Sequence, residues 1–488
     1  MKKEVDIILA SELFGELWIW NDIEITGISD DSRRIKPGYA FIALKGNEKD
    51  GYDYISDAVE KGASVILSYK NAQAAVPVIE AENIREMVAR TAKKFYFSDE
   101  KKFKLIGVTG TNGKTTVTHI VKDILESCGK TVGIIGTNGI FIRGERKDLY
   151  KNTPTTPNAP ELWQMFDVMV KSGIEYIVME VSSHALSLDR VYGCEFDVGV
   201  FTNLTREHLD FHETMEEYRR AKEKLFGISK IGVINIDDIA GTKIYSNIKG
   251  KKVSVGFDDA DFTIHALSVK EAMSEFMIEH DNEIEKTTLS LPGKFNVYNA
   301  LLSVACCVGV GIDFKEAVKG LKNVKPVKGR MEKVPLEEEF SVIIDYAHSP
   351  DGLEKVIHTL KGCARGRVIT LFGCGGDRDR SKRALMGEIS GRFSDFTVIT
   401  SDNPRTENPF LIIEDIVEGI KKTRGRFTVI IDRKKAIEYA LSIADKGDMV
   451  LLAGKGQEDY QIIGREKIPF DEAGIVREYS HRKKNEKG

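Results

Sequence analysis

The fold is decided by one stretch of the chain, LIGVTGTNGKTT at residues 105–116. The stretch runs from a short apolar strand through a glycine turn into a helix, which we predict over residues 115–127. In such a turn the glycines let backbone N–H groups close around phosphate oxygens, and the helix N-terminus adds its positive end. The side chain of Lys114 would neutralise the β- and γ-phosphates, and the Thr115 hydroxyl would hold Mg²⁺.

This stretch predicts an ATP-binding loop, although its spacing is not the strict one. Val108 stands where the pattern GxxxxGK[ST] has its first glycine. The alternative is an incidental glycine turn before a helix, which leaves the complete strand–loop–helix context unexplained. The predicted nucleotide-binding residues of the loop are Gly110, Thr111, Asn112, Gly113, Lys114, Thr115 and Thr116.

Apolar strands alternate with helices on the C-terminal side of this loop. Residues 262–291 alternate as antiparallel strands do, and a helix is predicted over residues 299–311. Buried strands separated by helices are typical of a parallel sheet that is covered on both faces. The predicted strands of this sheet lie at residues 105–108, 132–135, 176–179, 198–201 and 232–234.

Similar patterns precede and follow this central region. Before it we predict strands at residues 39–44 and 64–67, a helix at 84–96 and a charged linker at 98–102. After it we predict strands at residues 341–345, 368–372, 396–400, 427–431 and 449–452, and a disordered tail at 479–488.

The sequence therefore predicts an α/β protein of three domains, at residues 1–100, 103–325 and 326–488. The central domain is expected to hold a doubly wound, mostly parallel sheet of the P-loop type, and the C-terminal domain to be Rossmann-like. Ligands of such sheets bind beyond the carboxyl ends of the strands.

The composition limits the classes of function. The 488 residues carry a net charge of −4, without the basic excess that is typical of a nucleic-acid binder. The six cysteines form no CxxC pair, which indicates free thiols in a reducing compartment. No apolar run is long enough to cross a bilayer, and the first residues lack the apolar core of a secretion signal. We expect a cytoplasmic monomer without membrane insertion.

Two further polar side chains follow strands of the predicted sheet. Glu180 ends the apolar strand at 176–179, and an acidic residue there could hold Mg²⁺ beside the phosphates. The alternative is a strand-end carboxylate in solvent, but the neighbouring residues 182–184 (SSH) favour a site. His208 lies after another strand and could also be a ligand, whereas a lone histidine is more often structural.

Three motifs together resemble the Mur ligases, and within them the MurE type. They are GTNGKTT at residues 110–116, MEVSSH at 179–184 and NLTREHLDFH at 203–212. The resemblance extends over nearly the whole chain. It implies an N-terminal domain that binds UDP, a central domain that binds ATP and a C-terminal domain that binds an amino acid.

The resemblance also implies residue roles that no pattern gives by itself. Lys222 alone reads as a helix-surface lysine, but in this family the matching lysine is carbamylated, and a carbamate binds Mg²⁺ through oxygen. The implied catalytic residues are Lys114, His208 and Lys222, and the implied metal ligands are Thr115, Glu180, His208 and carbamylated Lys222. Outside the loop, the implied ATP contacts are Asn299, Arg330 and Asp345. The implied contacts of the UDP-linked muramoyl dipeptide are Ser32, Thr155, Thr156, Ser182 and Arg190, with Leu188 at a position where the family often has glutamine.

The stretch DNPR at residues 402–405 is associated in this family with meso-diaminopimelate. This substrate has a second carboxylate, which the planar guanidinium of Arg405 matches bidentately, whereas lysine has none. Without the family, Arg405 reads as a surface arginine in a turn. The implied diaminopimelate contacts are Arg378, Asp402, Asn403, Pro404, Arg405, Gly454 and Glu458, with Gln457 at a position where the family usually has histidine.

The expected reaction is ATP-dependent formation of an amide bond. It joins meso-diaminopimelate to the D-Glu side-chain carboxylate of UDP-N-acetylmuramoyl-L-alanyl-D-glutamate, through an acyl phosphate, with Mg²⁺ as cofactor. The alternatives are the same ligase using L-lysine, a folylpolyglutamate synthase, and a nucleotide-binding regulatory protein without catalysis. We expect small-molecule partners and no nucleic acid.

Overall fold

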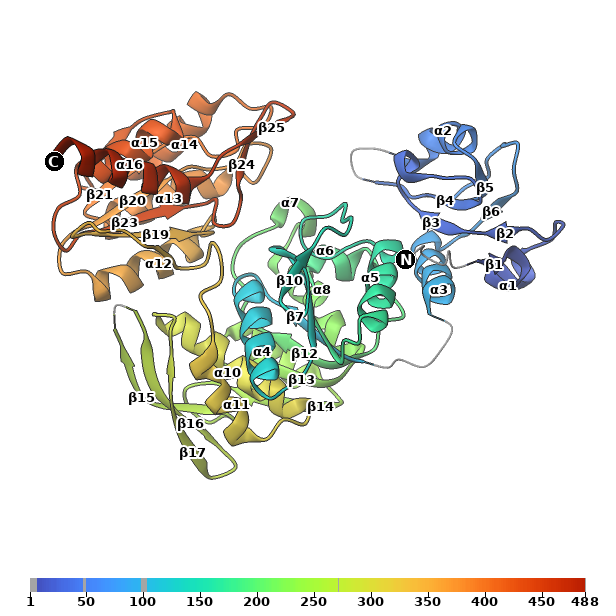
Figure 1. The fold of residues 1–488 in the computed structure, drawn as a ribbon, viewed down its shortest axis with the longest axis horizontal. Coiled ribbons are helices and arrows are strands. Elements are labelled where there is room, and N and C mark those ends of the chain that lie inside the picture. The colour runs from blue at the N-terminus through green and yellow to red at the C-terminus, as the bar shows by residue number, and fades with distance from the viewer. Residues whose placement is uncertain (1–6, 47–49, 98–102, 271, 488) are drawn as a thin grey trace. The chain divides into compact units, whose positions relative to one another are not determined.

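The computed structural model describes residues 7–46, 50–97, 103–270 and 272–487 (Figure 1). The predicted linker at 98–102 and the last residue of the predicted tail lie outside these residues. The chain divides into two compact units, which are described separately below. The first unit comprises residues 1–109, 129–199 and 221–231, and the second comprises residues 110–128, 200–220 and 232–488.

The first unit begins with a four-stranded parallel sheet. Its strands, in spatial order, are β3 (Gly27–Ser29), β4 (Tyr39–Ala43), β5 (Ala63–Ser68) and β6 (Val78–Glu80). The sequence of β4 is YAFIA, and its last four residues are buried, as expected for a parallel strand covered on both faces. Helix α2 (Ile55–Glu60) contacts β5, and α3 (Ile84–Tyr96) packs against α5 (Ala159–Lys171). A hairpin of β1 (Ile8–Leu9) and β2 (Glu24–Ile25) stands beside α1 (Ala10–Phe14).

The central sheet has eight strands in the order β10-β9-β8-β11-β7-β12-β13-β14. Strand β11 pairs in parallel with both β7 and β8, so the residues that follow these strands emerge at one edge. All five residues of β11 are buried, and its first four, YIVM, are mainly apolar, whereas the fifth is Glu180. The strand bounds are β7 (Lys104–Thr109), β8 (Val132–Gly136), β9 (Gly139–Ile142), β10 (Glu145–Lys147), β11 (Tyr176–Glu180), β12 (Phe196–Phe201), β13 (Ser229–Asn235) and β14 (Lys251–Val255).

Helices and an antiparallel sheet complete the central region. Helix α4 (Lys114–Ser127) packs against α10 (Lys294–Gly309), and both belong to the second unit. The three-stranded sheet, in the order β15-β16-β17, is antiparallel, as its alternating sequence predicts. Its strands are β15 (Thr263–Val269), β16 (Ser274–His280) and β17 (Glu283–Leu289). The other helices are α6 (Ser183–Ser187), α7 (Leu209–His212), α8 (Met215–Gly227), α9 (Ile239–Asn247) and α11 (Phe314–Gly320).

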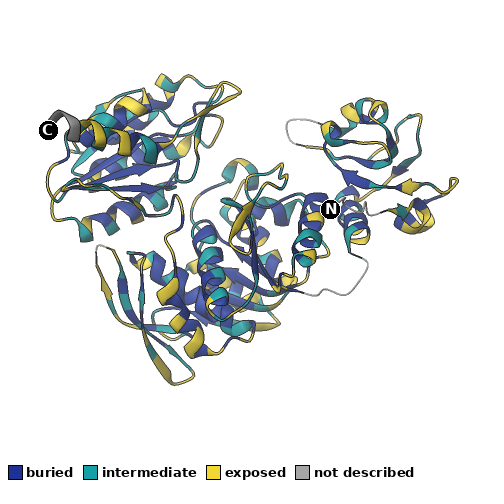
Figure 2. Cartoon of the chain, in the orientation of Figure 1, coloured by how far each residue is buried: buried dark blue, intermediate teal, exposed yellow. Residues whose placement is uncertain are grey.

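The C-terminal region of the second unit is a doubly wound sheet in the order β18-β19-β23-β20-β21-β22. Its four inner strands, β19, β23, β20 and β21, are largely buried (Figure 2), and alternate side chains of these strands enter two different apolar clusters. One cluster includes α12 (Pro350–Cys363), α13 (Ser381–Phe393) and α14 (Pro409–Ile420), and the other includes α15 (Arg433–Ser442) and α16 (Glu472–Lys487). The strands are β18 (Glu332–Val334), β19 (Ser341–Asp345), β20 (Val368–Phe372), β21 (Phe396–Ile399), β22 (Phe427–Val429) and β23 (Met449–Ala453), followed by a hairpin of β24 (Tyr460–Ile463) and β25 (Glu466–Pro469).

The predicted α/β class is confirmed, and two local predictions are wrong. The tail at 479–487 is not disordered but belongs to α16, because Ile475, Val476 and Tyr479 of this helix pack against the C-terminal core. Helix α10 begins at Lys294 rather than at residue 299, directly after Gly293, whose φ is 103°. The predicted domain limits stay a prediction. Within the described residues, no helix has the length and apolar character needed to cross a membrane.

Candidate functional site

The glycine loop after β7 is held by Asn203 and Lys114. The Lys114 ammonium donates to the carbonyls of Gly110 and Thr111, both at 2.8 Å. The Asn112 N–H donates to the Asn203 side chain at 3.0 Å, and the Thr111 N–H donates to the Asn203 carbonyl at 2.8 Å. Asn203 was not among the predicted residues, although it opens one of the motifs that carry the family resemblance.

Glycine is required in this loop for conformation and for space. Gly113 precedes α4 with φ 88°, and a Cβ there would lie 2.6 Å from the Asn299 side chain. A Cβ on Gly110 would lie 1.8 Å from the Thr202 hydroxyl. The first turn of α4 therefore starts directly at Lys114, with its N–H groups at the loop.

Three predicted nucleotide contacts lie near this loop or on the C-terminal sheet of the second unit. The Arg330 guanidinium donates to the Thr115 hydroxyl at 3.2 Å and lies over the Tyr346 ring at 4.4 Å. Asn299 lies beside Gly113. Asp345 ends β19, where burial raises the pKa of its carboxyl and the Met331 and Ala347 N–H groups donate to it.

Another contact of the loop was not predicted. The Asn112 side chain donates to Asp351 at 3.1 Å, near the start of α12. Nothing in the local sequence marks Asp351, because the two residues are far apart along the chain.

In the first unit, a polar cluster surrounds the end of β11. Glu180 is 1% exposed, and its carboxylate accepts hydrogen bonds from the Thr137 N–H at 2.7 Å and the Thr137 hydroxyl at 3.0 Å. The Thr156 hydroxyl donates to the Glu180 carbonyl at 2.9 Å and accepts from the Ser182 N–H at 3.0 Å. The Thr155 and Thr137 hydroxyls lie 3.1 Å apart.

Arg190 joins the same cluster. Its guanidinium donates to the Thr156 carbonyl at 3.2 Å, and burial lowers its pKa. The structure thus brings together Glu180 and four predicted substrate contacts: Thr155, Thr156, Ser182 and Arg190. Thr137 was not predicted, because no motif joins it to Glu180.

Ser32 lies in a short 3₁₀ helix that contacts the segment before this cluster. The helix is capped by Asp31, whose carboxylate binds Arg33 and accepts a hydrogen bond from the Tyr150 hydroxyl at 2.6 Å. The preceding Asp30 accepts from the Asn158 side chain at 2.6 Å. Ser32 is therefore held beside the segment that carries Thr155 and Thr156, within the first unit.

Two titratable groups of this segment were not predicted. Burial, followed by the charge of Asp30, raises the pKa of Glu161 to about 7. Burial also lowers the pKa of Lys151 to about 8. The Lys151 ammonium donates to the carbonyls of Gly136 and Pro154.

The remaining metal and catalytic candidates are His208 and Lys222. Lys222 is 1% exposed, so the interpretation of a surface lysine is wrong. Its helix α8 turns this residue, Tyr218 and Leu225 inward at the helical repeat. His208 has a φ of 57°, and its ring meets the Tyr218 ring edge to face. Among the described residues, no three His, Cys, Asp or Glu side chains gather as a cation site.

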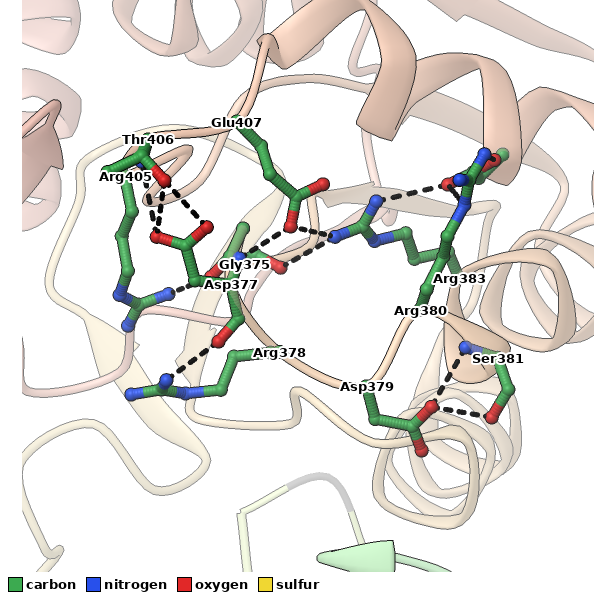
Figure 3. A network of polar contacts seen from close by, with 12 residues as sticks. Gly375, Asp377, Arg378, Asp379, Arg380, Ser381, Arg383, Arg405, Thr406 and Glu407 are labelled. Atoms are coloured by element: carbon green, nitrogen blue, oxygen red, sulfur yellow. Dashed lines mark hydrogen bonds and ion pairs between the residues drawn. The ribbon is translucent and has the colours of Figure 1, made fainter. Parts of the chain in front are cut away.

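The DNPR stretch lies in the loop after β21, and Figure 3 shows its last residue, Arg405. Arg405 has a φ of 51°, and its guanidinium donates to the Gly376 carbonyl at 2.7 Å. Arg378, in the loop after β20, donates to the Asp377 carbonyl at 2.8 Å. Burial, followed by the charge of Arg378, lowers the pKa of Arg405. The positive charge of Arg378 thus disfavours the positive charge of Arg405. An anion bound beside the two guanidinium groups would offset this repulsion.

The loop after β23 supplies the rest of this group. The Asn403 side chain donates to Glu458 at 2.8 Å and accepts from the Lys455 ammonium at 3.0 Å. Gly454 has a φ of 110°, and a Cβ there would lie 2.8 Å from the Asp402 carboxylate. The structure therefore gathers the predicted diaminopimelate contacts on three neighbouring loops. Lys455, which is fully buried, was not predicted.

Comparisons with known proteins agree with this arrangement. Sequence profiles match at residues 24–96 (Mur ligase family, catalytic domain), 108–307 (Mur ligase middle domain) and 329–456 (Mur ligase, glutamate ligase domain).

Several relatives carry the name UDP-N-acetylmuramoyl-L-alanyl-D-glutamate–2,6-diaminopimelate ligase, and two of them illustrate the similarity. The one from Caldanaerobacter subterraneus subsp. tengcongensis is 46% identical over 94% of this chain and 95% of its own. The one from Clostridioides difficile is 46% identical over 97% and 98%. A solved structure of a ligase of this name is similar with a TM-score of 0.67 and 32% identity, over 94% of this chain and 95% of its own.

The fold, the glycine loop and the similarity to known ligases together define the class of this protein. It is an enzyme, an ATP-dependent ligase that forms amide bonds. The chain belongs to the Mur ligase family.

Proposed function

We propose that the chain adds meso-diaminopimelate to the D-Glu side-chain carboxylate of UDP-N-acetylmuramoyl-L-alanyl-D-glutamate, in peptidoglycan synthesis. The observation that carries this choice is the pair of guanidinium groups of Arg405 and Arg378 on adjacent loops. The names of the relatives support the same substrate.

The two arginines distinguish diaminopimelate from lysine. Arg405 is disfavoured as a cation by burial and by Arg378, so a carboxylate that arrives between them offsets both effects. Diaminopimelate brings such a carboxylate at its distal end, and Glu458 faces its distal ammonium. Lysine offers no distal carboxylate, and its ammonium would meet two cations.

The reaction proceeds in two steps. First, a D-Glu carboxylate oxygen attacks the γ-phosphorus of ATP, and the bond between the γ-phosphorus and the oxygen of the β-phosphate breaks. ADP is the leaving group, and the product is an acyl phosphate. Next, the neutral amine of diaminopimelate attacks the acyl carbon, loses a proton and displaces inorganic phosphate. Neither step needs a nucleophilic side chain, so the protein contributes position and electrostatic stabilisation.

Lys114 and the loop N–H groups stabilise the phosphate charge. The Lys114 ammonium already lies against the loop, where it donates to two carbonyls that phosphate oxygens would replace. The other loop residues at the phosphates are Gly110, Thr111, Asn112, Gly113, Thr115 and Thr116. Outside the loop, the proposed ATP contacts are Asn299, Arg330 and Asp345.

The oxygen donors of the chain fit Mg²⁺. Thr115 supplies a hydroxyl and Glu180 a buried carboxylate, which are the ligand types that this cation prefers. His208 in the second unit and Lys222 in the first, the latter as a carbamate, are the other ligands that we propose. When bound, the cation neutralises charge on the phosphate oxygens.

The UDP-linked substrate is held by residues of the first unit. Ser32 contacts the UDP part, and the cluster of Thr155, Thr156, Ser182 and Arg190 contacts the muramoyl dipeptide near Glu180. We further infer a cytoplasmic location, since all six cysteines are free thiols, as in a reducing compartment. That the chain is a monomer stays a prediction.

Product formation tests the proposal. The purified chain is incubated with UDP-N-acetylmuramoyl-L-alanyl-D-glutamate, ATP and Mg²⁺, and receives either meso-diaminopimelate or L-lysine. We expect a tripeptide product and phosphate release in the reaction that receives diaminopimelate, and neither in the reaction that receives lysine. Preference for lysine would keep the ligase and reject the assignment of Arg405, and no substrate-dependent phosphate release would reject the activity.

A further inference from the structure

The loops after β20 and β21 touch through their backbones. These are residues 373–379 and 400–407, shown in part in Figure 3. A Cβ on Gly376 would lie 1.9 Å from the Pro404 carbonyl oxygen, so only glycine fits there. The Gly376 N–H donates to the Asn403 carbonyl at 2.9 Å. A shift of one loop therefore moves the other.

Three side chains tie these loops together in both directions, and we name Asp377, Thr406 and Glu407 the loop clamp. The Glu407 carboxylate accepts the Asp377 N–H at 2.5 Å. The Asp377 carboxylate in turn accepts the Thr406 N–H at 3.2 Å and the Thr406 hydroxyl at 2.9 Å. These bonds lower the pKa of Asp377, through the Thr406 hydroxyl first, so the clamp is charged at neutral pH.

Arg383 fixes the clamp to the core. Its side chain is 1% exposed and donates to Glu407 at 2.8 Å and, on the other side, to Asp415 at 3.0 Å. Its contact with Glu407 lowers the pKa of that carboxyl. Helices α13 and α14, which carry Arg383 and Asp415, are packed against each other. The clamp therefore rests on a rigid base.

The clamp holds two residues in a strained backbone conformation. These are Asp377, which directly precedes Arg378, and Arg405 itself. Asp377 and Arg405 have φ values of 53° and 51°, a left-handed conformation that residues other than glycine rarely adopt. Such residues persist where the surroundings over-determine them. The Arg405 guanidinium binds a carbonyl of the opposite loop, so its direction depends on how the two loops meet.

We propose that the loop clamp is a positioning device that sets the spacing of Arg405 and Arg378 for the distal carboxylate of the incoming amino acid. Its members act through the two arginines. This inference rests on the proposed function, because it deepens the account of the same site.

Two pairs of variants test the clamp. Thr406→Val removes the hydroxyl that binds Asp377, and Thr406→Ser restores it at an exposed position. Glu407→Ala removes the acceptor of the Asp377 N–H. Arg392→Gln is the matched control, since it breaks an ion pair with Glu388 on the same helix, α13, but involves neither Arg383 nor the clamp.

Steady-state kinetics supply the readout, with each substrate varied in turn. For Glu407→Ala and Thr406→Val we expect KM for diaminopimelate to rise about 10- to 100-fold, because an error of about 1 Å in position can cost that much. KM for ATP and for the UDP-linked substrate should stay within about twofold. Thr406→Ser and Arg392→Gln should both behave as the unmodified chain.

The outcomes separate this inference from the proposed function. If the unmodified chain shows no diaminopimelate-dependent turnover, the proposed function fails. If it is active and Thr406→Val leaves KM for diaminopimelate within twofold, the clamp is overturned, even where Glu407→Ala does not fold. Equal rises in KM for all three substrates would also overturn it, since they would indicate a merely structural role.

Discussion

Removal of the Arg433 charge should open the C-terminal sheet locally. The Arg433 side chain is fully buried and donates to Glu472 at 2.8 Å and to the Ala453 carbonyl, at the end of β23, at 2.9 Å. The Glu472 side chain is 2% exposed. Its Oε1 accepts the bond from Arg433, and its Oε2 accepts no hydrogen bond from the described residues. In Arg433→Met this carboxylate would stay buried without its cation.

The expected cost follows from the burial of both partners. Removing one member of a buried ion pair costs about 3–5 kcal/mol, which is about 100- to 5,000-fold in the opening equilibrium. Removing both charges in Arg433→Met/Glu472→Leu should restore part of this stability. The restoration stays incomplete because the Asp402 carboxylate, 3.7 Å from the Arg433 guanidinium, also loses its cation. Arg392→Met is the control, because its pair with Glu388 is exposed and is worth less than about 1 kcal/mol.

Native-state hydrogen exchange is the suitable assay, since it reports the opening of separate segments in a chain of several domains. The protection of amides in β23 and α15 is compared among the four proteins. A loss of less than tenfold in Arg433→Met would refute the reasoning. So would a double variant that exchanges as fast as the single one.

Three other predictions concern the site. Lys114→Ala should lower substrate-dependent phosphate release by about 100- to 1,000-fold, since one lost contact to developing phosphate charge costs that much, and near-normal release would reject the phosphate role. Arg405→Lys should raise KM for diaminopimelate about 10- to 100-fold with KM for ATP unchanged, because a charged hydrogen bond is lost; equal KM for diaminopimelate would reject the contact. Glu161 has a pKa raised from 4.5 to about 7, so the folded state binds the extra proton, and its stabilising effect is full below pH 4.5 and lost as pH rises to about 7. Relative to Glu161→Gln, the free energy of unfolding should therefore fall by about 3 kcal/mol between pH 4.5 and pH 8 in urea titrations, and a flat difference would contradict the burial of this carboxyl.

Strands that are buried on both faces could be predicted closely from the sequence. The predictions for β19 and β20 have the observed bounds, because each is an apolar run between turn residues. The tail was misjudged since its many lysines and arginines outweighed Ile475, Val476 and Tyr479, which recur at helical spacing. The glycine loop at residues 110–113 could be located because all its residues are adjacent in sequence, whereas its phosphate role stays a prediction.

Contacts over long sequence distances could not be predicted. Arg383 lies on α13, where its sequence, SKRALMGE, suggests a surface residue, yet its side chain is almost completely buried. The bond between Thr137 and Glu180 joins positions on two separate strand ends. Only the paired strands bring these residues together, and no local pattern records the pairing.

The contact of Gly376 with the Pro404 carbonyl limits how this protein could evolve. Any other residue at position 376 would push the two loops apart and move both arginines at once. Selection for a different amino acid substrate is therefore expected to change the side chains at positions 378 and 405, one at a time, while the backbone between them is inherited unchanged.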